Sequence, residues 1–103
     1  MPSSKNSFAE QVYQKTKQVP QGRVTTYKAI AEALGTKAYR AVGQALHCNP
    51  YAPLVPCHRV VASNGHLHGF ASGLPQKKKL LEKEGVVIQK NVINLDTYFF
   101  RVR

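Results

Sequence analysis

The sequence predicts a small, mainly α-helical domain that carries a winged helix-turn-helix, with a short β hairpin as the wing. Two short stretches with apolar residues at helical spacing are separated by Gly35. An Asn-Gly pair, Asn64-Gly65, lies between the runs 58–62 and 66–70, which is the strongest short signal for a hairpin. The chain has 103 residues, enough for one domain with a modest core. We expect residues 1–103 to form this single domain, with 1–6 and 96–103 as peripheral termini.

The first helix is expected over residues 8–18. Ser7 and Glu10 fit a capping box, in which the serine hydroxyl and the glutamate carboxylate each satisfy a free backbone amide. The Pro20-Gln21-Gly22 segment that follows predicts a turn.

The second and third helices form the predicted helix-turn-helix. Thr25 or Thr26 can cap the second helix, and Gly35 ends it. Thr36 is expected to cap the third helix, over residues 37–47. The apolar stripes of the two helices are Tyr27, Ile30, Ala31 and Leu34, and Ala38, Val42, Ala45 and Leu46. The opposite face of the third helix carries Arg40, Gly43, Gln44 and His47, a composition that suits entry into a DNA groove. A small helical bundle without DNA is the alternative.

The remaining elements are shorter. Asn49-Pro50 breaks the third helix, and Pro53 and Pro56 favour an extended segment. Pro75 opens a last helix, which ends at Gly85. Short strands are expected at 86–88 and 92–95, and the aromatic run 98–100 is expected to anchor the C-terminus.

The charge balance is strongly basic. Lysine and arginine number 15 against 5 aspartate and glutamate residues, so the net charge is +10. Nucleic acid is the first partner expected for such a chain, although solubility alone is an alternative explanation. The charges are spread from Lys5 to Arg103, which favours a basic folded surface over a disordered basic tail.

Composition also narrows the class of protein. Apolar residues make up 43% of the chain, which predicts a folded protein. No apolar run approaches the ~20 residues of a membrane span, and the first residues contain no apolar block typical of a secretory signal. We therefore expect no membrane association and a cytoplasmic protein, or a nuclear one if the source is eukaryotic.

The pair Cys57-His58 is the densest signal for chemistry. A thiol needs thiolate character to act as a nucleophile, and a nearby imidazole oriented by a carboxylate can remove its proton. Glu84 or Glu82, at the end of the last helix, can supply that carboxylate. The alternative is an inert buried thiol. A zinc site assembled from the two cysteines and four histidines is disfavoured because their spacing is unlike that of zinc knuckles, so we expect no metal.

The order of several motifs resembles one protein family. PCHRVV is preceded by RAVGQAL and NP, and is followed by SNG, GF and SGL. Over about residues 8–87 the chain is similar to the C-terminal catalytic domain of the O6-alkylguanine-DNA alkyltransferases. This resemblance implies irreversible, stoichiometric transfer of an alkyl group from O6-alkylguanine in double-stranded DNA to a cysteine. It also implies nucleotide flipping from the minor groove, no cofactor and a monomer.

The resemblance implies roles for five catalytic residues. Cys57 corresponds to the nucleophile, His58 to the base that acts through water, and Glu84 to the carboxylate of the relay. Tyr27 corresponds to the tyrosine that protonates the departing base. Asn49 corresponds to the hinge residue that ties the helix pair to the cysteine loop.

The resemblance also implies DNA and base contacts. Arg40 corresponds to an arginine finger that fills the gap left by the flipped nucleotide. Other expected DNA contacts are Tyr27, Ala41, Gly43, Gln44 and Arg59. The expected base pocket contains Leu46, Val60, Phe70 and Ala71. Phe70 stands where many relatives have a tyrosine, and Ala71 where some have a serine.

Two other functions remain open at this stage. Alkyltransferase-like proteins are close to this size and bind alkylated DNA without repairing it, but they typically have Trp or Ala at the nucleophile position, where this chain has Cys57. A winged-helix transcription regulator would instead bind undamaged DNA in a sequence-specific manner.

Overall fold

The structure is a computed structural model that describes residues 7–51, 54–67 and 73–103. Its helices are α2 (Phe8–Thr16), α3 (Tyr27–Ala33), α4 (Tyr39–His47), α5 (Leu74–Lys83) and α6 (Leu95–Tyr98), with a 3-10 turn, η1 (Cys57–Arg59). Its strands are β1 (Thr25–Thr26), β2 (Val60–Val61), β3 (Ile88–Gln89) and β4 (Val92–Ile93). The predicted mainly α-helical class with small strands is confirmed. None of the described helices is long and apolar enough to cross a membrane.

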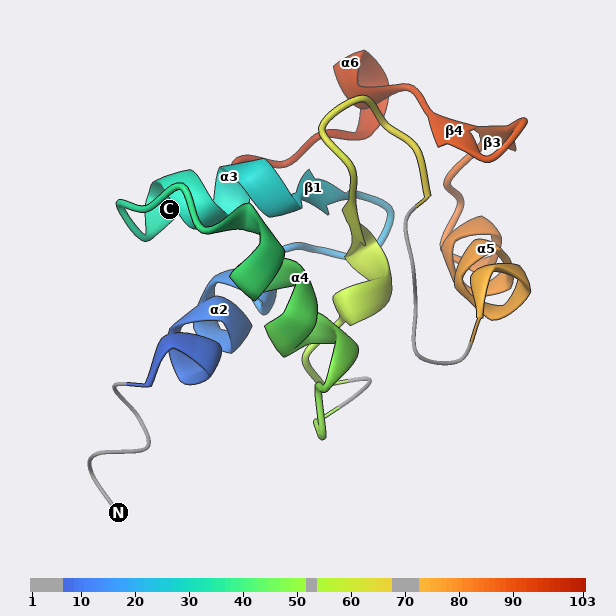
Figure 1. Cartoon of the computed structure of the whole chain (residues 1–103). Coiled ribbons are helices and arrows are strands. Elements are labelled where there is room, and N and C mark those ends of the chain that lie inside the picture. Colours follow the sequence, from blue (N-terminus) through green and yellow to red (C-terminus); the bar gives the residue numbers. More distant parts are fainter. Residues whose placement is uncertain (1–6, 52–53, 68–72) are drawn as a thin grey trace.

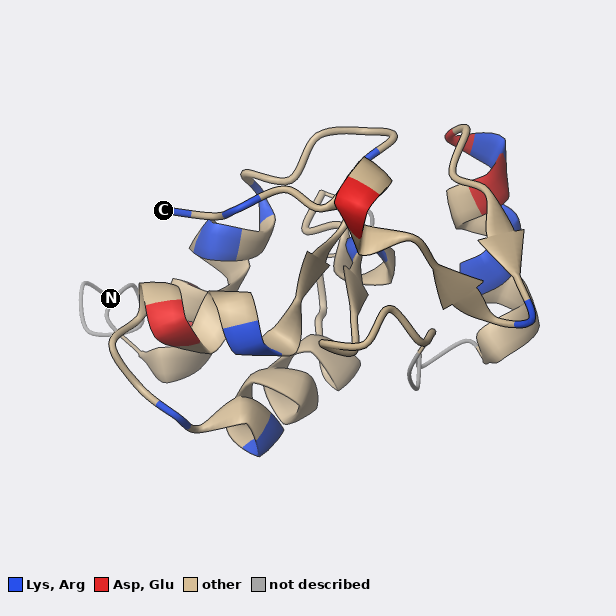
Figure 2. Ribbon diagram, turned by 90° about the horizontal axis from the view of Figure 1, so that it is seen from above, with Lys and Arg blue, Asp and Glu red and all other residues tan. Residues whose placement is uncertain are grey.

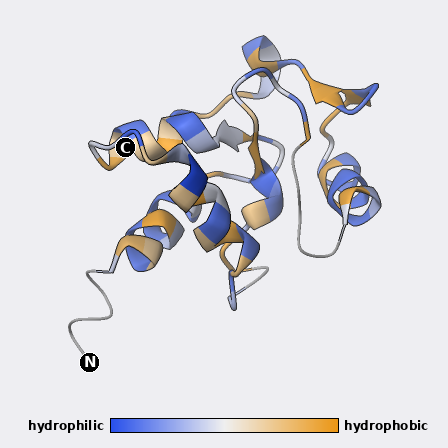
Figure 3. Ribbon diagram, viewed as in Figure 1, coloured by the Kyte–Doolittle hydropathy of each residue, from blue (hydrophilic) through white to orange (hydrophobic). Residues whose placement is uncertain are grey.

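Helices α2, α3 and α4 pack together and form the larger core (Figure 1). Ser7 and Thr26 cap α2 and α3 as predicted, each accepting a hydrogen bond from the amide three residues later. Each helix carries both apolar and polar residues (Figure 3). Their buried residues include Val12, Ile30, Ala31, Val42 and Leu46. This core also contains Cys57 and Val60, so the cysteine segment is part of the helical packing.

Helix α4 begins two residues later than predicted. The Thr36 hydroxyl accepts a hydrogen bond from the Ala38 amide, and the Tyr39 amide bonds to the Lys37 carbonyl. These local bonds compete with helix formation and leave Ala38 outside the helical region of backbone space, at φ −80° and ψ 60°. The helix therefore starts at Tyr39, without a side-chain cap.

The predicted hairpin forms its turn and one hydrogen bond between its flanks, from the Ala62 amide to the His66 carbonyl. Residues 68–70 of its second run lie outside the described residues. The Gly65 amide bonds to the Ala62 carbonyl and closes the turn. However, β2 pairs in parallel with β1, with Thr25 opposite Val60 and Thr26 opposite Val61. On the far side of the turn His66 bridges antiparallel to Val92. Long-range pairing thus holds β2 in addition to the local turn, and it joins the cysteine segment to the strand before α3.

A second core lies beside α5. It contains Val24, Val61, Leu67, Leu81, Val86 and Ile93. The sequence predicts short strands at 86–88 and 92–95. The observed strands β3 and β4 are shorter and pair antiparallel, and β4 is visibly apolar (Figure 3). Gly65 passes so close to this hairpin that a Cβ there would collide with the Ile93 carbonyl, and its φ of 87° also favours glycine.

The C-terminal segment is predicted to be peripheral, but part of it packs into the domain. The Phe100 amide bonds to the Val24 carbonyl, and the Val24 amide bonds to the Tyr98 carbonyl. Val102 is buried in the larger core, and both Lys15 and Gln18 of the first helical region donate to the Arg103 carbonyl. Burial of Val102 explains why this segment folds back onto α2.

Candidate functional site

Cys57 and His58 occupy the tight turn η1, directly before β2. Their side chains are nearly buried, at 9% and 5% exposed. The Cys57 amide bonds to the Val55 carbonyl and the Arg59 amide to the Pro56 carbonyl, so both ends of the turn are held by the backbone. Tyr27, the first residue of α3, packs against the core that contains Cys57 and is close enough for the Cys57 charge to raise its pKa.

Glu84 determines which ring nitrogen of His58 carries the hydrogen. The two side chains meet at 3.0 Å between His58 Nε2 and Glu84 Oε2. An ionised carboxylate can only accept hydrogen bonds, so Nε2 carries the hydrogen in the neutral imidazole and Nδ1 remains an acceptor. Of the two carboxylates considered in the sequence, the site uses Glu84.

The ionisation states fit a base and its orienting carboxylate. Burial lowers the pKa of His58 and outweighs the opposing effect of Glu84, which keeps the imidazole neutral near pH 7. Burial alone would raise the pKa of Glu84, but hydrogen bonds from Arg59 and His58 and their charges outweigh burial and lower it. A neutral imidazole beside an ionised carboxylate can accept a proton.

The placement of Arg59 corrects its expected role in DNA binding. Its Nε donates to Glu84 Oε1 at 2.9 Å and one terminal nitrogen donates to Oε2 at 2.6 Å. The other terminal nitrogen donates to the Val19 carbonyl at 2.9 Å. The guanidinium is thus committed to holding Glu84, and its side chain is only 16% exposed.

Lys77 is a site residue that the sequence reasoning missed. It is fully buried, its Nζ donates to the Val60 carbonyl at 2.7 Å, and Nζ lies 5.9 Å from the centre of the Tyr27 ring. Burial lowers the pKa of Lys77 to about 8, while interaction with Cys57 opposes this shift. Helical spacing could have revealed it, because Lys77, Leu81 and Glu84 are four and three residues apart and share one face of α5.

Tyr27 stays protonated over the physiological range. Burial, and then the nearby Cys57, raise the pKa of Tyr27 to about 12. The phenol is therefore a hydrogen-bond donor that can give a proton only when a stronger base forms next to it.

Asn49 ties the end of the helix pair to the segment before Cys57. Its Nδ2 donates to the Val55 carbonyl at 2.8 Å, and its Oδ1 accepts from the Tyr51 amide at 2.8 Å. Val55 in turn accepts from the Cys57 amide. These contacts fit the hinge position expected for Asn49.

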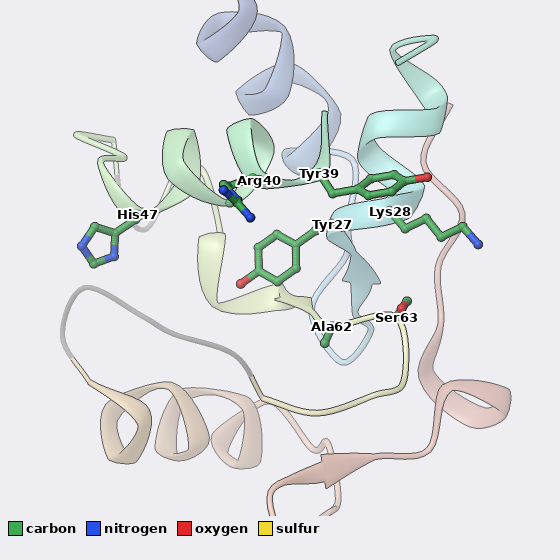
Figure 4. A pocket seen from close by; sticks show the side chains of 8 residues that line it. Tyr27, Lys28, Tyr39, Arg40, His47, Ala62 and Ser63 are labelled. Carbon is green, nitrogen blue, oxygen red and sulfur yellow. The ribbon is translucent and has the colours of Figure 1, made fainter. Parts of the chain in front are cut away.

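A hollow of about 520 Å³ opens between α3, α4 and the loop after β2 (Figure 4). Its lining residues are Tyr27, Lys28, Tyr39, Arg40, Gly43, His47, Ala62 and Ser63. Tyr27 points into it from the start of α3, and Gly43 leaves room there, since an added Cβ would lie 3.8 Å from the Tyr27 ring.

The other predicted contact residues divide into three groups. Arg40 and Gln44 are exposed and Ala41 is half-buried on α4, as a groove-facing helix requires. Leu46 and Val60 are buried at 4% and 0% exposed and are not among the residues that line the hollow. Phe70 and Ala71 lie outside the described residues.

Basic residues occur over both the α2–α4 part and the α5 part of the ribbon, as the sequence predicted (Figure 2). Within the described ranges, no group of three or more His, Cys, Asp or Glu side chains is arranged to hold a metal ion.

The family described as 6-O-methylguanine DNA methyltransferase, DNA binding domain, matches residues 7–86. The chain belongs to this family. A methylated-DNA–protein-cysteine methyltransferase of Metallosphaera sedula is 55% identical over 84 residues, which are 82% of this chain and 53% of that protein. The chain thus spans about half the length of the curated relatives it matches. The predicted resemblance is confirmed.

Two solved structures of this family's fold are informative. Mycobacterium tuberculosis OGT in complex with DNA matches with a TM-score of 0.74 and 40% identity, covering 77% of this chain and 50% of that chain. S. pombe Atl1, in complex with damaged DNA containing O6-carboxymethylguanine, matches with a TM-score of 0.80 and 35% identity. The Atl1 match covers 90% of this domain and 94% of that chain.

Proposed function

We propose that this domain repairs double-stranded DNA by transferring the alkyl group of O6-alkylguanine irreversibly to Cys57. The observation that carries the proposal is the buried series of Cys57, His58 and Glu84, in which Arg59 holds the carboxylate. An inert buried thiol has no need of an imidazole with a defined hydrogen and a free acceptor nitrogen. Membership of the methyltransferase family supports the same reaction.

The first step is formation of the thiolate. Nδ1 of His58 accepts the thiol proton through a water molecule, and Glu84 stabilises the imidazolium that results. Interaction with Cys57 opposes the fall in the pKa of Lys77, so the ammonium lies close enough to interact with the negative charge that forms on the sulfur. Burial strengthens both interactions because little water screens them.

The second step is displacement at the alkyl carbon. A bond forms between the Cys57 sulfur and the alkyl carbon as the bond from that carbon to guanine O6 breaks. The electron pair of the broken bond leaves with guanine, which takes a proton from Tyr27. Tyr27 regains a proton from the His58 imidazolium through water, because its raised pKa does not allow it to remain a phenolate. One proton leaves the thiol and one enters guanine, so no cofactor is needed. Cys57 is left as a stable thioether, and each molecule therefore reacts only once.

The duplex binds over the hollow, and the alkylated nucleotide enters it. A base inside the duplex cannot reach a buried thiol, so the alkylated nucleotide must leave the stack. Arg40 and Gln44 are exposed on α4, and Gly43 permits close approach to the minor groove. Arg40 fills the gap in the stack. The domain acts as a monomer, and its DNA affinity falls as salt rises because phosphate contacts release counterions.

The second candidate function is lesion binding without transfer. The match to Atl1 covers nearly the whole of both chains, whereas the match to OGT covers half of that protein. In this alternative the same hollow binds the lesion, but Cys57 does not react.

Intact mass after incubation with a duplex containing O6-methylguanine separates the two functions. We expect a gain of one methyl group on the wild type and on Cys48→Ser, whose cysteine is exposed on the end of α4, but none on Cys57→Ser. Tight lesion binding without any adduct would overturn alkyl transfer in favour of lesion binding alone.

A further inference from the structure

Tyr39 is an aromatic side chain on the wall of the hollow that the proposed chemistry does not use. It is the first residue of α4 and directly precedes Arg40. Its ring is 40% exposed and lies on the Lys28 side of the hollow, away from His47 (Figure 4).

Tyr51 provides a comparison, because it is exposed to a similar extent, at 46%. Tyr51 packs edge-on against Tyr13, with 5.6 Å between ring centres, and its hydroxyl donates to Glu10 Oε2 at 3.3 Å. Within the described part of the chain, Tyr39 has neither a ring partner nor a hydrogen bond from its hydroxyl. The ring of Tyr51 therefore has a structural role, whereas the ring of Tyr39 faces the open hollow.

Two cations accompany Tyr39. Lys28 on α3 and Arg40 on α4 both line the same hollow, and both are exposed. Neither makes an ion pair with another described residue. A planar aromatic face between two available cations fits a nucleotide, because the ring packs on a base or sugar and the cations pair with phosphates.

We propose that Tyr39 packs against the nucleotide next to the flipped one on the damaged strand, while Lys28 contacts its phosphate. Tyr27 points into the hollow between Arg40 and Ala62, and we place the flipped nucleotide beside it, so Tyr39 meets the neighbouring nucleotide on the Lys28 side (Figure 4). This contact rests on the proposed function. Because stacking strength differs between bases, Tyr39 makes the reaction depend on the flanking sequence.

The experiment measures alkyl transfer to Cys57 from a lesion duplex below saturation, and separately from free O6-benzylguanine. We expect Tyr39→Ala to slow the reaction with the duplex about tenfold and to leave the free-base reaction unchanged. Tyr39→Phe keeps the planar face and should stay close to the wild type, whereas Tyr39→Leu should resemble Tyr39→Ala. Val87→Ala is the control, because Val87 is 58% exposed and does not line the hollow, and it should leave both rates unchanged. Thermal unfolding confirms that each variant folds.

Salt dependence of lesion-duplex binding distinguishes the ring from the cation. Lys28→Gln should lower the slope of log K against log salt by about one, because one phosphate contact is lost. Tyr39→Ala should weaken binding about tenfold without changing that slope. Changing the base beside the lesion should alter the wild-type rate more than the Tyr39→Ala rate.

Unchanged duplex rates for Tyr39→Ala would overturn the contact, and so would an equal loss with free O6-benzylguanine. Failure of the proposed function has a different outcome, in which the wild type gains no alkyl group from either substrate. Even then, the binding measurement with lesion duplex decides whether Tyr39 contacts DNA.

Discussion

The interior around Glu84 and the hollow beside α4 use the same kinds of residue in opposite ways. In the interior, the guanidinium of Arg59 is held by Glu84 and the Val19 carbonyl, and Lys77 is held by the Val60 carbonyl. On the wall of the hollow, Lys28 and Arg40 are exposed and available to a phosphate. The paired charges set protonation states within the protein, and under the proposed function the exposed ones gain their partners only when DNA binds. Interior variants should therefore affect transfer from any substrate, and variants in the hollow should affect only transfer from DNA.

The largest effect is expected from Glu84→Gln. The amide cannot stabilise an imidazolium as a carboxylate does, so transfer from free O6-benzylguanine should fall about 100-fold. Loss of the Arg59 ion pair should also lower the melting temperature. Glu82→Gln is the matched control, because Glu82 is exposed on the same helix. Equal rates for wild type and Glu84→Gln would remove Glu84 from the relay.

Lys77→Met should slow transfer from free O6-benzylguanine about tenfold at pH 7, because the stabilising positive charge beside Cys57 is lost. Burial lowers the pKa of Lys77 to about 8, so the wild type has this charge below pH 8 and loses it above. The difference between wild type and variant should therefore shrink as pH rises through 8. Lys79→Met, an exposed position on α5, serves as the control. A difference that stays constant from pH 6.5 to 9.5 would contradict an electrostatic role.

Arg40→Ala should slow transfer from a lesion duplex about tenfold and leave transfer from free O6-benzylguanine unchanged, because the finger acts only on DNA. Arg23→Ala removes the same charge outside the hollow, where Arg23 donates to the Thr97 carbonyl. A slower reaction of Arg40→Ala with free O6-benzylguanine would contradict the claim that residues of the hollow affect only transfer from DNA.

The smallest effect is expected from Gly43→Ala. The new methyl group would meet Tyr27 at an ordinary contact distance of 3.8 Å, so the fold accepts it, and α4 should gain up to about 1 kcal/mol of stability. The same methyl narrows the approach of DNA, so transfer from a lesion duplex should fall a few-fold. Thermal unfolding and the duplex rate together check both halves of the prediction.

Local features of this protein could be predicted from its sequence alone. The caps at Ser7 and Thr26 form as expected, and α5 ends before Gly85, whose φ is 96°. Each of these depends on hydrogen bonds between residues three or four apart, or on a backbone angle that favours glycine. The nucleophile candidate Cys57 and its neighbour His58 were also evident, because adjacency in sequence ensures proximity.

Only the tertiary structure decided which partners the middle of the chain would take. The valines after Arg59 pair with Thr25 and Thr26, some 35 residues away, and only Ala62 bonds to His66 across the turn at Asn64-Gly65. That pairing turns Arg59 inward to Glu84 and brings the Val60 carbonyl to Lys77. Local propensity cannot foresee these contacts, because burying Val60 and Val61 in two different cores depends on elements far apart in the sequence. The sequence by itself therefore determined which thiol is the candidate nucleophile, and the tertiary structure decided which charges surround it.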